Sequence, residues 1–259
     1  MTLALKRSAL IALGLLVGIH ASPAGATPSN PAAPGSQEKP APAPAPAPAP
    51  TPAPHQEKPV APTADAAVDS INKFIAEQKI DKEKTDWRTK VPKPPQATFD
   101  PKKTYYWVVE TNIGTVKVKL LPDVAPMHVS VCIYLTNLGF YDTLKFHRVI
   151  QNFMAQGGCP LGTGTGSPGY KMAGEFKASV SHSKAGMLSA ANAGPDTDSS
   201  QFFLTFVPTL HLDGLHTIYG EVAEGLDTTV KELEKRGSKD GSGRTSEPLF
   251  IKKATIEVK

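Results

Sequence analysis

The chain has 259 residues and a formal net charge of +4, with 28 basic residues spread among 24 acidic ones. No basic block with interleaved aromatic residues occurs, so we expect no nucleic-acid partner. The cysteines form no CxxC pair and no histidines have zinc-ligand spacing, so we expect no metal and no cofactor. Isolated cysteines are commonly small core residues, and we favour buried thiols for Cys132 and Cys159 over a disulfide formed in an oxidising compartment.

Residues 1–26 have the pattern of a secretory signal peptide. Lys6 and Arg7 precede a run, 8–19, that is apolar apart from its first residue, and the small residues 24–26 suit a cleavage site. The run is shorter than the ~20 residues that a spanning helix needs. We therefore expect a periplasmic or secreted protein with no membrane span after cleavage. The alternative is an uncleaved anchor.

Residues 27–63 have the composition of a linker. Of 25 prolines in the chain, 13 fall between Pro28 and Pro62, and residues 40–50 strictly alternate proline and alanine. Proline fixes φ and lacks an N–H donor, so this composition predicts an extended spacer rather than a helix or a sheet. The alternative function is a docking ligand for a domain that reads proline-rich segments.

Residues 64–97 combine a helical pattern with a proline-rich connector. Val68, Ile71, Phe74 and Ile75 follow helical spacing and predict a helix within 64–84. A helix this short is marginal alone, so we expect it to dock on the domain that follows.

Residues 98–259 form the predicted globular domain, which is mainly β. Pro126 and Gly139 suit the two ends of one helix, and 226–236 predicts another. Many short strands with two helices favour a closed barrel capped by the helices, and periodicity leaves a sandwich as the alternative. The expected strands are 105–110, 115–121, 145–150, 153–156, 186–190, 202–206, 217–221 and 249–258.

Three blocks in this domain carry candidate chemistry: 146–158 (FHRVIQNFMAQGG), 189–203 (SAANAGPDTDSSQFF) and 207–220 (VPTLHLDGLHTIYG). Strand alternation places Arg148 on the same face as Phe146 and Ile150. Taken singly, the first block also fits an arginine whose stem covers apolar surface, and the second fits a loop between two strands.

In this order the three blocks closely resemble the cyclophilin signatures, and the similarity runs from about residue 104 to 258. The resemblance implies a closed eight-stranded antiparallel barrel with two helices, and a monomeric peptidyl-prolyl cis–trans isomerase that assists the folding of proline-containing polypeptides. It assigns catalysis to Arg148. It assigns substrate binding to Phe153, Met154, Gln156, Ala191, Asn192, Ala193, Gln201, Phe203, His211, Leu212 and His216.

The chain departs from many eukaryotic cyclophilins at two places. His211 stands where they have tryptophan, which helps them bind cyclosporin, and the glycine-rich loop 162–169 is shorter. That loop also fits GxGxxG, but no βαβ unit surrounds it and no P-loop lysine follows, so we reject nucleotide binding. Asp196 and Asp198 are spaced like calcium ligands, but the loop glycine and the final glutamate are missing.

Two other functions fit the sequence. A secreted binding module would use the same groove to hold proline-containing segments without isomerising them. A structural envelope protein would act through its proline–alanine stalk. Arg148 favours the enzyme, since an apolar groove alone would suffice to hold proline.

Overall fold

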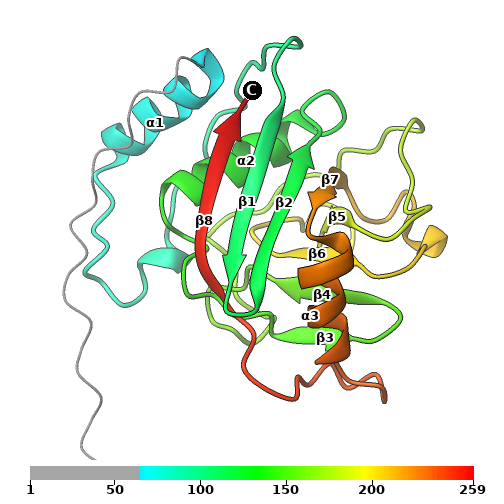
Figure 1. Cartoon of the computed structure of the whole chain (residues 1–259). Coiled ribbons are helices and arrows are strands. Elements are labelled where there is room, and N and C mark those ends of the chain that lie inside the picture. The colour runs from blue at the N-terminus through cyan, green and yellow to red at the C-terminus, as the bar shows by residue number, and fades with distance from the viewer. Residues whose placement is uncertain (1–64) are drawn as a thin grey trace, which may run out of the picture. The chain divides into compact units, whose positions relative to one another are not determined.

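The computed structural model describes residues 65–259, so the predicted signal peptide and linker, 1–26 and 27–63, lie outside the described residues. The described part contains one eight-stranded sheet in the order β3-β4-β6-β5-β7-β2-β1-β8, with every neighbouring pair antiparallel. The eight predicted strands are all present (Figure 1). They are β1 Tyr105–Thr111, β2 Gly114–Leu120, β3 Arg148–Ile150, β4 Met154–Gly157, β5 Met187–Ala190, β6 Phe202–Thr205, β7 Ile218–Glu224 and β8 Ile251–Val258.

The sheet is a curled half-barrel. The prediction of a closed barrel is therefore wrong in one detail, because the sheet stays open between its outer strands. The outer strands β3 and β8 form no ladder with each other. The segment that precedes β3 is instead joined to the start of β8 by single contacts. These are an isolated bridge between Lys145 and Phe250, and hydrogen bonds of 2.9 Å from the Phe146 amide to the Leu249 carbonyl and from the Ile251 amide to the Leu144 carbonyl. Because β3 has only three residues, it offers too little backbone for a ladder that would close the barrel.

The core lies between the concave side of the sheet and the helix α2, Pro126–Asn137. The inward residues of β1 alternate with exposed or half-buried ones, and Trp107 is fully buried. Its indole packs edge-to-face on Phe202 of β6, with ring centroids 4.9 Å apart. This contact joins the long strands β8, β1 and β2 to the short strands on which the candidate site is built.

Helix α2 is buried over His128–Thr136 because it is covered on more than one side. The sheet strands β7 and β8 contact it, and so does α1, Ala66–Gln78 (Figure 1). Phe74 of α1 packs edge-to-face on Tyr134 of α2, with ring centroids 5.7 Å apart. The predicted docking of the N-terminal helix is confirmed by these contacts.

Asp65 fixes the start of α1 to the barrel. Its carboxylate accepts hydrogen bonds from the Val68 amide at 2.9 Å and the Tyr105 hydroxyl at 2.9 Å, and it lies 3.1 Å from the Lys103 ammonium. The first bond caps the helix and the other two join it to the start of β1. The described helix, connector and barrel therefore belong to one compact unit.

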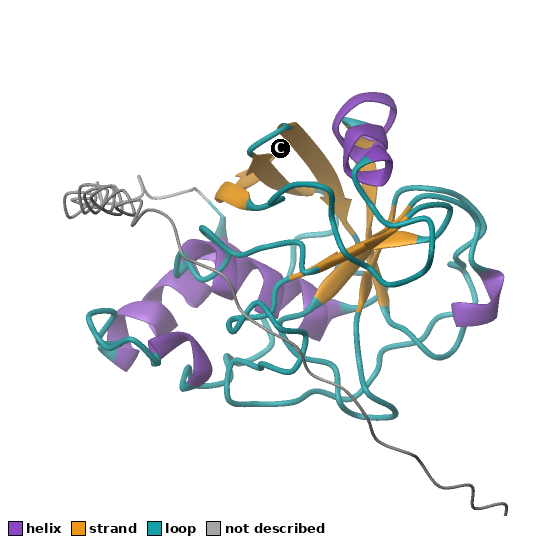
Figure 2. Ribbon diagram, turned by 90° about the horizontal axis from the view of Figure 1, so that it is seen from below, coloured by secondary structure: helices purple, strands orange, loops and turns teal. Residues whose placement is uncertain are grey.

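The second predicted helix is divided into two parts. Leu226–Val230 is a π-helical turn, and α3, Lys231–Lys235, continues it. The Val230 amide reaches back five residues to the Gly225 carbonyl at 2.9 Å, which is the hydrogen bond of a π turn. Helix α3 packs against β3 and β4, the strands that carry Arg148 and its neighbours. Loops make up much of the remaining chain (Figure 2).

Candidate active site

One hollow of about 140 Å³ brings together nine of the twelve site residues predicted from the sequence. Strands β3 and β4 pair with Arg148 opposite Gln156, so these two side chains stand next to each other. In turn Gln156 lies opposite Phe203 of β6. The hollow is lined by Arg148, Phe153, Met154, Gln156, Ala191, Asn192, Phe203, Leu212 and His216.

The Arg148 guanidinium is half-buried and forms no ion pair within residues 65–259. Its Nη1 lies 3.5 Å from Oε1 of Gln156 and 3.8 Å from Sδ of Met154, and its Cζ lies 5.8 Å from the centre of the Phe153 ring. Guanidinium carries five N–H donors and stays charged. Most of these donors therefore remain available to a ligand in the hollow.

A chain of neutral amides supports this side of the groove. Gln156 Nε2 donates to Gln201 Oε1 at 3.1 Å, and Gln201 Nε2 donates to the carbonyls of Gly164 and Gly166, both at 2.9 Å. The same two glycines donate their amides to Sγ of Cys159 at 3.2 and 3.3 Å. The sulfur and Gln201 thus both bind main-chain groups of the glycine-rich loop.

Both cysteines are free and buried, which confirms the favoured interpretation of the two thiols. Burial raises the pKa of the Cys132 thiol. Burial acts in the same direction on Cys159, but the surrounding backbone N–H groups outweigh it and lower the pKa of that thiol.

The apolar side of the hollow is built around Phe203, which is 4 % exposed. Its ring stacks on His182, with centroids 6.0 Å apart, and meets His216 edge-on at 5.3 Å. The Nδ1 of His216 lies 2.9 Å from the Ala190 carbonyl, and a carbonyl only accepts, so Nδ1 carries a proton. His216 is thereby fixed as part of the pocket wall.

The other three predicted residues lie around this hollow. Ala193 and Gln201 line an adjoining hollow of about 340 Å³ together with the glycine-rich loop. His211 lies on the exposed rim in the 3₁₀ turn Leu210–Leu212, and its ring stacks on Phe153 with centroids 5.9 Å apart. The structure therefore places all twelve predicted residues in or beside one groove.

A buried charged cluster beside the groove was missed by the sequence analysis. His128 of α2 is 3 % exposed, and its Nδ1 lies 2.6 Å from Glu175 Oε2 while its Nε2 lies 2.9 Å from Asp198 Oδ2. Asp198 was considered only as a calcium ligand. The three residues lie 47 and 70 positions apart along the chain. The available signal was a histidine in a helix that holds no acidic residue, lysine or arginine.

The two carboxylates determine the ionisation of His128. Burial lowers the pKa of the imidazole, but the hydrogen bonds and charges of Asp198 and Glu175 outweigh burial and raise it above the ordinary value. Burial raises the pKa of both carboxyls, while the hydrogen bonds to His128 bring the pKa of each below its usual range. An imidazolium between two carboxylates is the arrangement that these directions describe.

Within residues 65–259, no group of three or more histidine, cysteine or acidic side chains is arranged to hold a metal ion. None of the helices in this described part combines the length and apolar character needed to cross a bilayer.

Known proteins that resemble this chain in sequence are described as peptidyl-prolyl cis-trans isomerases. The model of the family described as cyclophilin type peptidyl-prolyl cis-trans isomerase/CLD matches residues 106–256. A peptidyl-prolyl cis-trans isomerase of Helicobacter pylori is 48 % identical over 135 residues, which are 52 % of this chain and 83 % of that protein. Peptidyl-prolyl cis-trans isomerase B of Bacillus subtilis is 47 % identical over 125 residues, which are 48 % and 87 % of the two chains.

Among solved structures, a cyclophilin type peptidyl-prolyl cis-trans isomerase of Cryptosporidium parvum, in the presence of the dipeptide Ala-Pro, is similar in fold. Its TM-score is 0.56 at 30 % identity, and the match covers 59 % of this chain and 98 % of that one.

Proposed function

The chain belongs to the family of cyclophilin-type peptidyl-prolyl cis–trans isomerases, and we propose that its groove isomerises X-Pro bonds with Arg148 as the catalytic residue. The observation that carries this assignment is the half-buried Arg148, which lines a hollow with one apolar side and has no ion-pair partner in the described part. An X-Pro dipeptide fits a site of this composition, and the Ala-Pro dipeptide of the Cryptosporidium parvum structure supports this substrate class.

The chemistry requires no nucleophile, because no bond is broken. Amide resonance gives the peptide bond a rotation barrier of about 18–20 kcal/mol. Rotation removes that resonance, so the proline nitrogen becomes a better hydrogen-bond acceptor in the rotated state. A guanidinium N–H directed at this nitrogen stabilises the rotated state more than the planar ones, and this difference accelerates the reaction.

The groove must bind the two sides of the X-Pro bond differently while the bond rotates. Phe153, Met154, Phe203 and Leu212 form the apolar side that we assign to the proline ring. Gln156 offers its side-chain amide to the substrate main chain on the other side of the bond. Asn192 offers its main-chain groups there, because its side-chain Nδ2 already donates to Asp198 and to the Leu215 carbonyl. When one end is held in an apolar pocket and the other by hydrogen bonds, rotation becomes a motion within a bound complex.

A binding module without catalysis is the second candidate, and it shares the groove. The two functions differ in what a small amount of protein does to an excess of an Ala-Pro peptide. We expect about one protein molecule per hundred peptides to increase the cis–trans exchange rate, measured by two-dimensional exchange NMR. A pure binding module would leave that rate unchanged at this ratio, although at higher ratios it would still shift the peptide resonances.

We further propose that the isomerase acts on exported proteins in the periplasm or outside the cell, assists their folding and works as a monomer. The support is the sequence pattern of residues 1–26, followed by the proline–alanine segment. Fractionation of the host cell, with mass spectrometry of the protein's N-terminus, tests this assignment. An exported protein that begins near residue 27 supports it, and intact residues 1–26 on a cytoplasmic protein would overturn it.

A further inference from the structure

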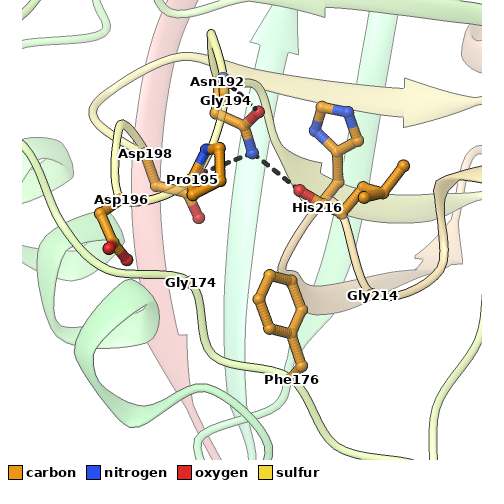
Figure 3. A pocket seen from close by; sticks show the side chains of 10 residues that line it. Gly174, Phe176, Asn192, Gly194, Pro195, Asp196, Asp198, Gly214 and His216 are labelled. Atoms are coloured by element: carbon orange, nitrogen blue, oxygen red, sulfur yellow. Dashed lines mark hydrogen bonds between the residues drawn. The ribbon is translucent and has the colours of Figure 1, made fainter.

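Asn192 links the groove to the buried charged cluster. It lines the 140 Å³ hollow, the adjoining 340 Å³ hollow and a third hollow of about 260 Å³ (Figure 3). Its side-chain Nδ2 donates to Asp198 Oδ1 at 2.8 Å and to the Leu215 carbonyl at 2.9 Å, as the dashed lines in Figure 3 show. The position of this asparagine therefore depends on where the Asp198 carboxylate lies.

Asp198 is held from several sides. Its carboxylate is 2 % exposed, and Oδ2 accepts from the Thr217 hydroxyl at 2.9 Å as well as from His128 Nε2 at 2.9 Å. The Asp198 carbonyl also accepts from the Met172 amide at 2.8 Å. A buried carboxylate with this set of donors is fixed in place while all of them remain.

Only the protonated form of His128 donates from both ring nitrogens. Glu175 already accepts from the amides of Met127 and His128, at 3.1 and 2.9 Å, which fits an ionised carboxylate. Ionised carboxylates are acceptors only, so both ring nitrogens of His128 must donate. The other ring facing His128 is Tyr219 of β7, 5.8 Å away between centroids, and burial raises the pKa of that phenol, which keeps it neutral.

We propose that His128 is a positioning residue for catalysis: as an imidazolium it fixes Asp198, and through Asp198 it fixes the Asn192 that holds the substrate main chain. This inference rests on the proposed function of the groove. Loss of the proton removes one donor and leaves two carboxylates facing a neutral ring, so the carboxylates repel each other. The raised pKa of His128 places this loss on the alkaline side, because a group with a raised pKa keeps its interactions until the pH rises through that value.

Two substitutions test the proposal, and both are measured as kcat/KM for an Ala-Pro peptide by exchange NMR between about pH 6 and pH 10. His128→Gln removes the titrating ring but keeps one amide donor. Asp198→Asn keeps an oxygen that accepts from Asn192, and its amide donates to a neutral His128, so this variant no longer needs the proton. Thr136→Val is the matched control, because Thr136 is a buried residue of the same helix outside the cluster.

In the wild type we expect kcat/KM to fall as the pH rises above neutral, while circular dichroism at the same pH values stays unchanged. His128→Gln should lose about 10- to 100-fold of kcat/KM at neutral pH, the size of effect caused by a misplaced substrate contact, and should show no further alkaline fall. Asp198→Asn should retain more activity and also lack the alkaline fall. Thr136→Val should match the wild type.

The proposal is overturned if His128→Gln is as active as the wild type, or if the alkaline fall persists in both cluster variants. If His128→Gln does not fold, the pH profile of Asp198→Asn alone decides between these outcomes. A wild-type protein that does not accelerate exchange at all would instead contradict the proposed function.

Discussion

The two walls of the groove are supported by different chemistry. The first wall presents Arg148 and Gln156, and behind it lies a chain of neutral groups that ends at the glycine-rich loop. The second wall presents the main chain of the neutral residue Asn192, and behind its side chain lie the charges of Asp198 and His128. In the first wall the charged group faces the groove and the neutral groups lie behind it, whereas in the second wall the neutral residue faces the groove and the charged groups lie behind it. The first wall directs its charge at the substrate, and the second uses its charges to hold a neutral contact.

Two buried histidines show how partner number determines charge in this region. His182 has one carboxylate partner, Asp213 at 2.7 Å, and a hydroxyl partner, Ser189 at 3.0 Å. Burial lowers the pKa of His182, and Asp213 alone does not offset it. His128 has two carboxylate partners and a raised pKa. We therefore expect the second wall to depend on pH through His128, while His182 remains a neutral support for Phe203.

The largest expected effect is on stability, when the charged support is broken. His128→Gln leaves two buried carboxylates with less compensation, and breaking a buried ion pair costs about 3–5 kcal/mol of unfolding free energy. The lowered pKa values of Asp198 and Glu175 mean that their contribution is present above their ordinary pKa values and is lost as the pH falls through the lowered ones.

Urea unfolding of the wild type and of His128→Gln, from about pH 3 to pH 9, measures this effect. The difference between the two proteins should be largest near neutral pH. It should shrink in acid, as the carboxyls take up protons, and in alkali, as wild-type His128 loses its proton. A difference that stays constant across this range would show that the cluster is not charged as described.

A smaller effect is expected when the neutral support of the first wall is broken. Gln201→Leu removes the hydrogen bonds to Gly164, Gly166 and Gln156. A neutral hydrogen bond contributes about 0.5–1.5 kcal/mol, so the loss of one such contribution to catalysis, through a displaced loop and Gln156, should lower kcat/KM by about 2- to 13-fold. The shape of the pH profile should stay that of the wild type, because no ionising group is altered. If kcat/KM of this variant depended on alkaline pH differently from the wild type, the claim that the two walls are supported independently would be contradicted.

The smallest effect on turnover is expected at the rim. His211 is exposed and stacks on Phe153 without entering the hollow. His211→Trp adds a broad apolar face with one N–H donor, so inhibition by cyclosporin should tighten while kcat/KM for the peptide changes little. Titration of both proteins with cyclosporin measures this, and superimposable inhibition curves would remove His211 from the determinants of drug affinity.

The eight strands could be predicted from the sequence, because the alternation of apolar and polar residues is a local pattern. Residues such as Arg148 and Asn192 could be placed in one groove only through the family resemblance, since they lie on different segments of the chain. The π turn at Leu226–Val230 and the open edge between β3 and β8 depend on contacts between segments, which periodicity does not report.

The charged cluster was missed for the same reason. His128 and Asp198 belong to a helix and a loop, and only the folded chain brings them to 2.9 Å. Docking of α1 was expected from its apolar face, but its attachment through Asp65 to Tyr105 required the structure.

Measuring kcat and KM separately for Arg148→Ala tests the central claim most directly. The protein should comprise residues 65–259, because the structure shows the helix, connector and barrel as one compact unit. Arg244→Ala, which alters an exposed arginine, is the control. A hydrogen bond from a charged group contributes about 1.5–3 kcal/mol, so the account predicts a fall in kcat of roughly 10- to 150-fold with little change in KM. Full retention of kcat in Arg148→Ala, with or without a rise in KM, would contradict the claim that this guanidinium stabilises the rotated bond.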